Sequence, residues 1–123
     1  IIDDEDGIRE TIKMQLEDMA FQGPFFDASS SEEALSILNE TKVDFILSDW
    51  NMNGASGFDF LLTLREEEAF KNIPFLMITA NDNISGVLAA IHRGASDYLI
   101  KPWSLLELQE KLSYAWLKHQ PDI

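Results

Sequence analysis

Residues 43–57 read VDFILSDWNMNGASG, and they combine a strand, a carboxylate and a turn. Strand-forming apolar residues lead up to Asp49, and the residues after it are small, amide-bearing or glycine, which favours a sharp change of chain direction. In an open α/β sheet, ligands bind beyond the carboxyl ends of the strands, where neighbouring loops part. Asp49 is therefore the leading candidate for a reactive group.

Composition limits the classes of protein to consider. A chain of 123 residues is one domain, spanning residues 1–123, and it is long enough to bury a core without disulfides or structural metals. The formal net charge of -13 opposes binding to nucleic acid or to an anionic membrane. The sequence has no cysteine and no apolar run near the roughly 18 residues of a membrane span, so we expect a cytoplasmic protein.

Strands and helices are predicted to alternate along the chain. Five apolar stretches have strand character: residues 1–2, 25–27, 43–49, 74–78 and 98–100. The first is shorter than a typical strand of about five or six residues, so further residues are expected upstream of Ile1. A helix is predicted after each strand. This alternation favours an α/β fold, with a five-stranded parallel sheet between two layers of helices.

The five helices are predicted from apolar residues at helical spacing. Gly23-Pro24 is expected to end the first helix, and the pairs Ser30/Glu33 and Ser104/Glu107 form capping boxes that begin the second and fifth. The apolar positions at this spacing are Ile8, Ile12, Leu16 and Met19; then Ala34, Leu35 and Leu38; then Phe58, Leu61, Leu62 and Leu64; then Ile84, Val87, Leu88 and Ile91; and finally Leu105, Leu108, Leu112 and Ala115, the last set being predicted to face inward.

Polar residues end four of the predicted strands: Asp3 and Asp4, Asp49, Thr79 and Lys101. In a parallel sheet these residues meet at one edge. Crowded carboxylates repel one another, and a divalent cation with oxygen ligands, Mg²⁺ above all, relieves the repulsion. A carboxylate beside such an ion can attack phosphorus, while a lysine and a hydroxyl stabilise the phosphoryl oxygens. The five residues together therefore predict a phosphoryl-accepting site.

Five motifs in register resemble one family. Asp3-Asp4, Asp49-Trp50-Asn51-Met52, Met77-Ile78-Thr79-Ala80, Gly94-Ala95-Ser96 and Lys101-Pro102 are similar in order and spacing to the receiver domain of two-component response regulators, especially the CheY-like type. The likeness covers nearly the whole chain. It implies a single flavodoxin-like domain with strand order 2-1-3-4-5.

The resemblance also implies roles for individual residues. Asp49 is the implied phosphoacceptor; Asp4, Asp49 and the backbone carbonyl of Asn51 are implied Mg²⁺ ligands, and Asp3 acts on the ion through water. Thr79 and Lys101 are the implied phosphate sensors. Tyr98 is implied to change rotamer on phosphorylation, and the Lys101-Pro102 peptide bond to be cis. Asn53 departs from the family pattern, because many members carry proline there.

A phosphorylation-activated switch is the function that the resemblance implies. A histidine kinase or a phosphotransfer protein supplies the phosphoryl group, and the receiver removes it by self-dephosphorylation without being a conventional turnover enzyme. The signal then reaches a downstream protein, an output domain or a phosphorylation-dependent dimer through the face of the fourth helix, fifth strand and fifth helix. Tyr98 and Leu106 are the residues expected on that face.

Two alternatives stay open at this point. A phosphohydrolase of the haloacid-dehalogenase type also forms an aspartyl phosphate, but it needs a second acid two residues after the nucleophile, where this chain has Asn51. A receiver fold can also act by protein contact without being phosphorylated. Retention of the acids, Thr79 and Lys101 favours the phosphorylated form.

Overall fold

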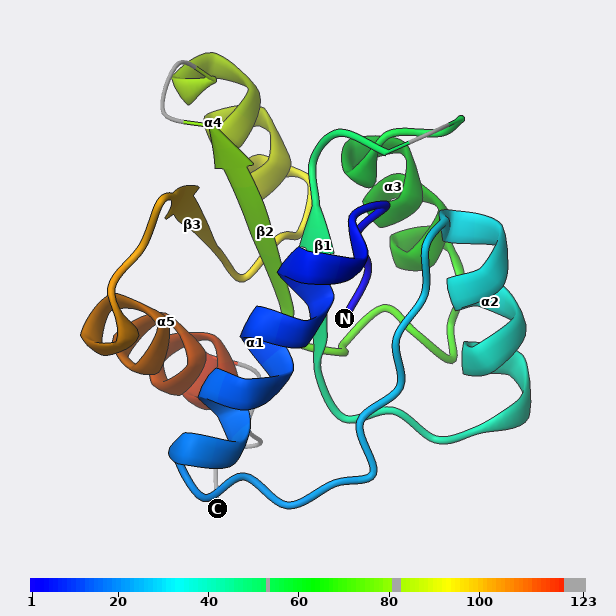
Figure 1. Cartoon of the computed structure of the whole chain (residues 1–123). Coiled ribbons are helices and arrows are strands. Elements are labelled where there is room, and N and C mark those ends of the chain that lie inside the picture. Colours follow the sequence, from blue (N-terminus) through cyan, green and yellow to red (C-terminus); the bar gives the residue numbers. More distant parts are fainter. Residues whose placement is uncertain (53, 81–82, 119–123) are drawn as a thin grey trace.

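A parallel sheet lies between two layers of helices (Figure 1). The computed structural model describes residues 1–52, 54–80 and 83–118. Asn53, the position that departs from the family pattern, lies outside these residues. The elements, in chain order, are α1 (Asp6–Asp18), α2 (Ser31–Glu40), β1 (Ile46–Asp49), α3 (Gly57–Glu66), β2 (Phe75–Ala80), α4 (Ile84–His92), β3 (Asp97–Lys101) and α5 (Leu105–Lys118). Among the described helices, none combines the length and the apolar character needed to cross a bilayer.

β1 and, apart from the exposed Ala80, β2 are buried on both faces, as expected for parallel strands, whereas in β3 only Leu99 is fully buried. Its strands run in the order β1-β2-β3, and neighbouring residues along each strand point to opposite sides. One core joins α1 and α5 to strand residues such as Leu47, Leu76 and Ile78. The other joins α2, α3 and α4 to Ile46, Phe75 and Met77. The two cores fix the sheet from both sides.

Three of the five predicted strands form, and the other two regions are joined only by isolated bridges at Ile2 and at Ala28, which directly follows the second stretch. Ile2 makes parallel bridges with Ala28 on one side and Ser48 on the other, so the first stretch lies between the second and β1. Residues 25–27 are not a strand, because only the short run from Ile1 to Asp3 lies beside this segment to supply backbone partners. The full order 2-1-3-4-5 stays a prediction.

Two helices do not turn the whole of their apolar stripe toward the core. In α4, Val87 and Ala90 are buried, whereas Ile84 and Leu88 are 65% and 63% exposed. The small Ala90 therefore points toward the sheet and the large side chains point to solvent. In α5, Leu108, Leu112 and Ala115 are buried as predicted, but Leu105, at the first turn, is exposed.

The helix starts follow the predicted capping chemistry in most cases. Ser104 and Glu107 exchange both hydrogen bonds of a capping box, as predicted. At α2, the Ser30 hydroxyl accepts from the Glu33 amide, but the Glu33 carboxylate accepts from Ser29 instead of Ser30. The first helix ends at Asp18, before the predicted Gly23-Pro24 stop.

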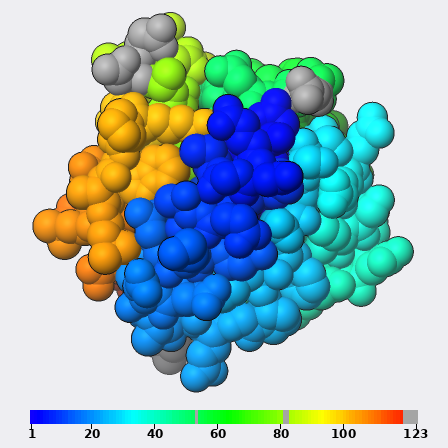
Figure 2. Space-filling model, in the orientation of Figure 1, coloured from blue at the N-terminus to red at the C-terminus, as the bar shows by residue number. Residues whose placement is uncertain are grey.

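The chain around β3 and α5 lies beside α1 on one face of the molecule. Figure 2 shows the orange segment around residue 100 next to the blue N-terminal segment. The Trp103 indole nitrogen donates to the Gln15 side-chain oxygen at 2.9 Å, which joins the two segments. The loop after β3 is thereby held against α1.

Candidate functional site

The predicted strand-end residues meet at the carboxyl edge of the sheet. Asp49 is the last residue of β1, Lys101 the last of β3, and Asp3 directly follows the bridge residue Ile2. Thr79 is the penultimate residue of β2. Because the strands are parallel and in register, these side chains come from four segments to one place.

Three carboxylates and one ammonium form the centre of the site. Asp3, Asp4 and Asp49 each offer an oxygen, and these oxygens lie within 4.8 Å of one another. Asp3 and Asp49 are buried and Asp4 is half-buried. The Lys101 ammonium lies 2.9 Å from an Asp49 oxygen and 3.6 Å from an Asp3 oxygen. One lysine therefore faces two buried acids.

The environment shifts the pKa of both partners in the closest pair. Burial raises the pKa of the Asp49 carboxyl above its ordinary value, and the charge of Asp3 adds to this, although the hydrogen bond from Lys101 opposes it. Burial acts against the charge of Lys101, but the hydrogen bond to Asp49 and the negative charges of Asp49 and Asp3 outweigh burial and raise its pKa. Lys101 is thus held in its cationic form beside the acids.

The donor set at this edge fits a hard divalent cation. All three acidic ligands present oxygen, the atom type that Mg²⁺ prefers. Within the described part of the chain, the buried Asp3 Oδ2 atom has no hydrogen-bond partner. A buried carboxylate oxygen without a donor is costly. A cation held by these residues would remove that cost.

Thr79 and Asn51 border a hollow next to the acids. A cavity of about 320 Å³ is lined by Trp50, Asn51, Thr79, Ala80 and Asn83. The Thr79 side chain is buried, and its hydroxyl accepts a hydrogen bond of 3.4 Å from the Asn83 amide nitrogen. That bond leaves the hydroxyl proton of Thr79 available to another acceptor. Asn51 is exposed at the mouth.

The two residues predicted on the partner face lie on β3 and α5. Tyr98 is half-buried in β3, three residues before Lys101, and the Lys111 ammonium lies 4.4 Å from its ring centroid. Leu106 is 62% exposed on the first turn of α5. The cis peptide bond predicted between Lys101 and Pro102 is confirmed.

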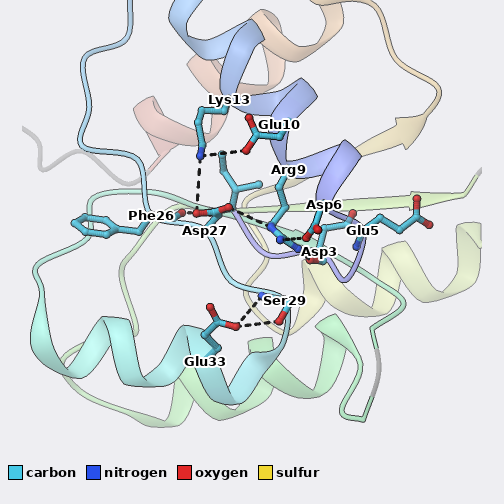
Figure 3. A network of polar contacts seen from close by, with 11 residues as sticks. Asp3, Glu5, Asp6, Arg9, Glu10, Lys13, Phe26, Asp27, Ser29 and Glu33 are labelled. Atoms are coloured by element: carbon cyan, nitrogen blue, oxygen red, sulfur yellow. Dashed lines mark hydrogen bonds and ion pairs between the residues drawn. The ribbon is translucent and has the colours of Figure 1, made fainter.

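Three residues that contribute to the site were not among the predicted ones. Arg9 donates to the backbone carbonyl of Asp3 at 2.6 Å (Figure 3). Asn83 contacts Thr79, and Gly57 begins α3 so close to Asp49 that an added Cβ would lie 2.1 Å from its carbonyl oxygen. Gly57 lies in the stretch 43–57 that contains Asp49, so its presence next to the site was visible in the sequence. The roles of Arg9 and Asn83 depend on loop geometry that spacing does not reveal.

Comparison with known proteins finds relatives along most of the chain. The family described as response regulator receiver domain matches residues 1–113. The chemotaxis protein CheY-3 of Vibrio cholerae is 36% identical over 112 residues, which are 91% of this chain and 85% of that protein. The chemotaxis protein CheY of Pseudomonas aeruginosa is 35% identical over 91% of this chain and 90% of its own length.

Solved structures give the same result for the fold. A response regulator receiver domain protein from Clostridium thermocellum has a TM-score of 0.84 and 28% identity, covering 95% of this chain and 91% of that one. The chemotaxis response regulator CheY4 of Vibrio cholerae has a TM-score of 0.83 and 28% identity, covering 93% of each chain. The chain shares with them a flavodoxin-like α/β fold with five helices around a parallel sheet.

Proposed function

Because this chain belongs to the response regulator receiver domains, the signalling domains of CheY-like two-component systems, we propose that it accepts a phosphoryl group on Asp49. The donor in this proposal is a phosphohistidine on a histidine kinase or a phosphotransfer protein. The observation that carries the proposal is the meeting of Asp3, Asp4, Asp49 and Lys101 at one sheet edge.

The acids form the proposed Mg²⁺ site. Asp4, Asp49 and the backbone carbonyl of Asn51 would hold the ion, with Asp3 acting through a water molecule. Bound Mg²⁺ supplies positive charge that offsets the negative charge of an incoming phosphoryl group. The Asp3 Oδ2 atom supports this assignment, since among the described residues it accepts no hydrogen bond and has only the Lys101 ammonium 3.6 Å away.

The protein's own groups account for the transfer itself. An Asp49 carboxylate oxygen attacks phosphorus; as the new O–P bond forms, the P–N bond to the donor histidine breaks and the imidazole takes the electron pair. Lys101, held cationic near Asp49, would attract the phosphoryl oxygens, and the free proton of the Thr79 hydroxyl would donate to one of them. Hydrolysis of the aspartyl phosphate by water then restores Asp49.

The output would be a shift between two states of the face made by α4, β3 and α5. Thr79 and Tyr98 are the proposed switch residues, since one contacts the phosphoryl group and the other lies on β3. A phosphoryl group shifts such an equilibrium only if it interacts better with one state. The exposed Ile84, Leu88 and Leu106 support this face as the contact for a downstream protein, an output domain or a second copy of the chain.

Intact-mass analysis tests the assignment of Asp49. After incubation with acetyl phosphate and Mg²⁺, the protein is expected to gain the mass of one phosphoryl group, and the Asp49→Asn variant is expected to gain none. Asp44→Asn is the matched control, because Asp44 is an exposed acid on the same segment. An adduct that persists in Asp49→Asn would contradict the assignment, and so would a parent protein that is never labelled.

Metal binding is tested separately by thermal unfolding. A ligand that binds only the folded state stabilises it by RT ln(1 + [L]/Kd), so millimolar Mg²⁺ is expected to raise Tm more than NaCl of the same ionic strength. The difference between the two salts is expected to shrink in Asp49→Asn. Equal effects of MgCl₂ and NaCl on the parent protein would rule out the proposed site.

A further inference from the structure

Arg9 joins three segments around the start of α1. Its Nη1 atom donates to the Asp3 carbonyl at 2.6 Å, its Nε atom donates to the Asp27 carboxylate at 3.2 Å, and its Nη2 atom contacts the Asp6 carboxylate (Figure 3). The side chain is only 12% exposed. Burial acts against its charge, but the hydrogen bonds to Asp27 and Asp6 outweigh burial and raise its pKa. Arg9 is therefore a fixed cation rather than a mobile surface side chain.

The bond from Arg9 to Asp3 acts on the backbone that both site acids share. The carbonyl of Asp3 belongs to the peptide plane between Asp3 and Asp4, and a planar peptide fixes the directions in which the chain leaves it. The Asp3 amide donates to Ala28, and the Asp3 side chain accepts from the Glu5 amide. Arg9 supplies a bond to the carbonyl of the Asp3–Asp4 peptide, so it restrains the plane that lies between the two residues carrying these carboxylates.

We infer that Arg9 is a positioning residue that holds Asp3 and Asp4 in a geometry ready to bind a divalent cation. The inference rests on the Mg²⁺ site of the proposed function. Two physical effects of Arg9 on that site have opposite signs. As a nearby positive charge, Arg9 repels a cation and weakens binding; as a restraint on the Asp3–Asp4 peptide, it strengthens binding. The sign of the change on removing Arg9 therefore separates the two effects.

The test is an Mg²⁺ titration of Arg9→Met followed by tryptophan fluorescence, since Trp50 directly follows Asp49. Loss of a group that orients metal ligands typically weakens binding by about tenfold or more, so Kd for Mg²⁺ is expected to rise about tenfold. Lys13→Met is the matched control. Lys13 lies one turn along α1, within 3.8 Å of Asp27 and 3.6 Å of Glu10, so the variant removes the same charge while leaving the Arg9–Asp3 bond in place. Its Kd is expected to stay the same or fall slightly.

Arg9→Lys provides a second, milder variant. It keeps the charge and can still reach one acceptor, but it cannot bridge all three, so its Kd is expected to lie between those of the parent and Arg9→Met. If Arg9→Met does not fold, weaker binding by Arg9→Lys relative to the parent still supports the inference, and an unchanged Kd overturns it.

Each result is assigned to one hypothesis. The inference is overturned if Arg9→Met binds Mg²⁺ as tightly as the parent, or more tightly, as loss of a repelling charge alone predicts. It is also overturned if Arg9→Met lowers Tm in EDTA while Kd stays the same, because the role is then only structural. A parent protein that does not bind Mg²⁺ refutes the proposed metal site itself, whatever the variants do.

Discussion

Two buried carboxylates, Asp3 and Asp49, share a single lysine at the sheet edge. Lys101 lies close to Asp49 and farther from Asp3, whose Oδ2 atom has no hydrogen-bond partner within the described ranges. A buried charge is tolerated when it is paired, and like charges in one site repel. The arrangement that suits a cation and a phosphoryl group is therefore unfavourable for stability while neither is bound.

Asp3→Asn is expected to stabilise the protein in EDTA. The amide removes one negative charge, can still accept from the Glu5 amide, and offers a donor toward Asp49. We expect a rise in Tm of about 4 °C, which corresponds to roughly 1 kcal/mol for a domain of this size. Circular dichroism melts measure it, with the exposed Asp44→Asn as the control, expected to change stability by less than about 0.5 kcal/mol. A lower Tm for Asp3→Asn would contradict this view of the site.

The principal acids could be predicted because their role follows from a local pattern. A carboxylate at the end of an apolar strand lies at the sheet edge whatever the rest of the fold does, which places Asp3 and Asp49 together. Arg9, by contrast, is an ordinary helix residue in the sequence. Its importance arises because the Asp3 carbonyl and the Asp27 carboxylate both face it, and that depends on the paths of two loops.

Among the helices, α3 begins directly against the end of β1. Its first residue, Gly57, donates from its amide to the Trp50 carbonyl at 2.8 Å. A Cβ at Gly57 would meet the Asp49 carbonyl oxygen at 2.1 Å and the Met77 sulfur at 3.1 Å. Neither the strand end nor the buried Met77 can move freely. The absence of a side chain at Gly57 is what lets α3 begin against the end of β1.

Gly57→Ala is accordingly expected to destabilise the fold and to disturb Asp49. Overpacking a well-packed contact costs typically 1–3 kcal/mol, and we expect about 2–3 kcal/mol in urea unfolding together with slower labelling by acetyl phosphate. Gly7→Ala is the control. A Cβ at Gly7, inside α1, would meet nothing within 4 Å, so alanine there is expected to stabilise the protein by about 0.5–1 kcal/mol. Equal effects of the two substitutions would show that the contact at Gly57 is unimportant.

Arg65, near the end of α3, connects this helix to residues 70–73 and to Gly94. Its guanidinium donates to the backbone carbonyls of Gly94, Phe70 and Ile73, at 3.0, 2.9 and 2.7 Å. Burial lowers the pKa of Arg65 to about 10, which reflects a cation surrounded by protein. The three carbonyls lie outside the strands and helices, and that of Phe70 also accepts from the Ile73 amide at 3.4 Å.

Arg65→Met is expected to cost about 2–3 kcal/mol, because unsatisfied buried acceptors cost roughly 1–3 kcal/mol. Urea unfolding measures the loss, with an unchanged m-value if the folded and unfolded ensembles keep their compactness. Arg93→Met removes an exposed arginine at the end of α4 and is expected to change stability by less than about 0.5 kcal/mol. Similar losses in the two variants would refute the structural role of Arg65.

The orientation of α4 shows where sequence-based reasoning on elements is weakest. A regular stripe through Ile84, Val87 and Leu88 predicts which residues share a face, but a helix with several apolar positions has more than one such face. The structure turns Val87 and the small Ala90 inward, which leaves Ile84 and Leu88 exposed. Packing against the sheet, which the periodicity does not contain, decides between the faces.

For the molecule as a whole, the alternation of strands and helices was the sequence pattern that best predicted the fold. Apolar runs and helical stripes alternate along the chain, and this pattern alone predicts the layered α/β arrangement. The lengths of the strands were less predictable, because a strand forms only where a neighbour supplies backbone partners. The stretch at residues 25–27 has strand composition but contributes a bridge only at the adjacent Ala28.

The net charge of -13 implies a response to monovalent salt. Repulsion among like charges disfavours the compact state, and salt screens it over a Debye length of about 10 Å at 0.1 M. We expect Tm in EDTA to rise by a few degrees between low salt and about 0.5 M NaCl. A Tm that falls over this range would mean that favourable ion pairs, such as those of Arg9 and Lys101, outweigh the repulsion.

The outward-facing side chains of α4 and α5 also affect how separate molecules behave toward one another. Ile84, Leu88 and Leu106 give each molecule exposed apolar surface that favours association. The large negative charge keeps molecules apart at neutral pH. As acid protonates the carboxylates, that colloidal repulsion fades before the apolar surface changes. Static light scattering at increasing protein concentration should then show repulsion at neutral pH turning into attraction at mildly acidic pH, and Leu88→Glu should delay that change.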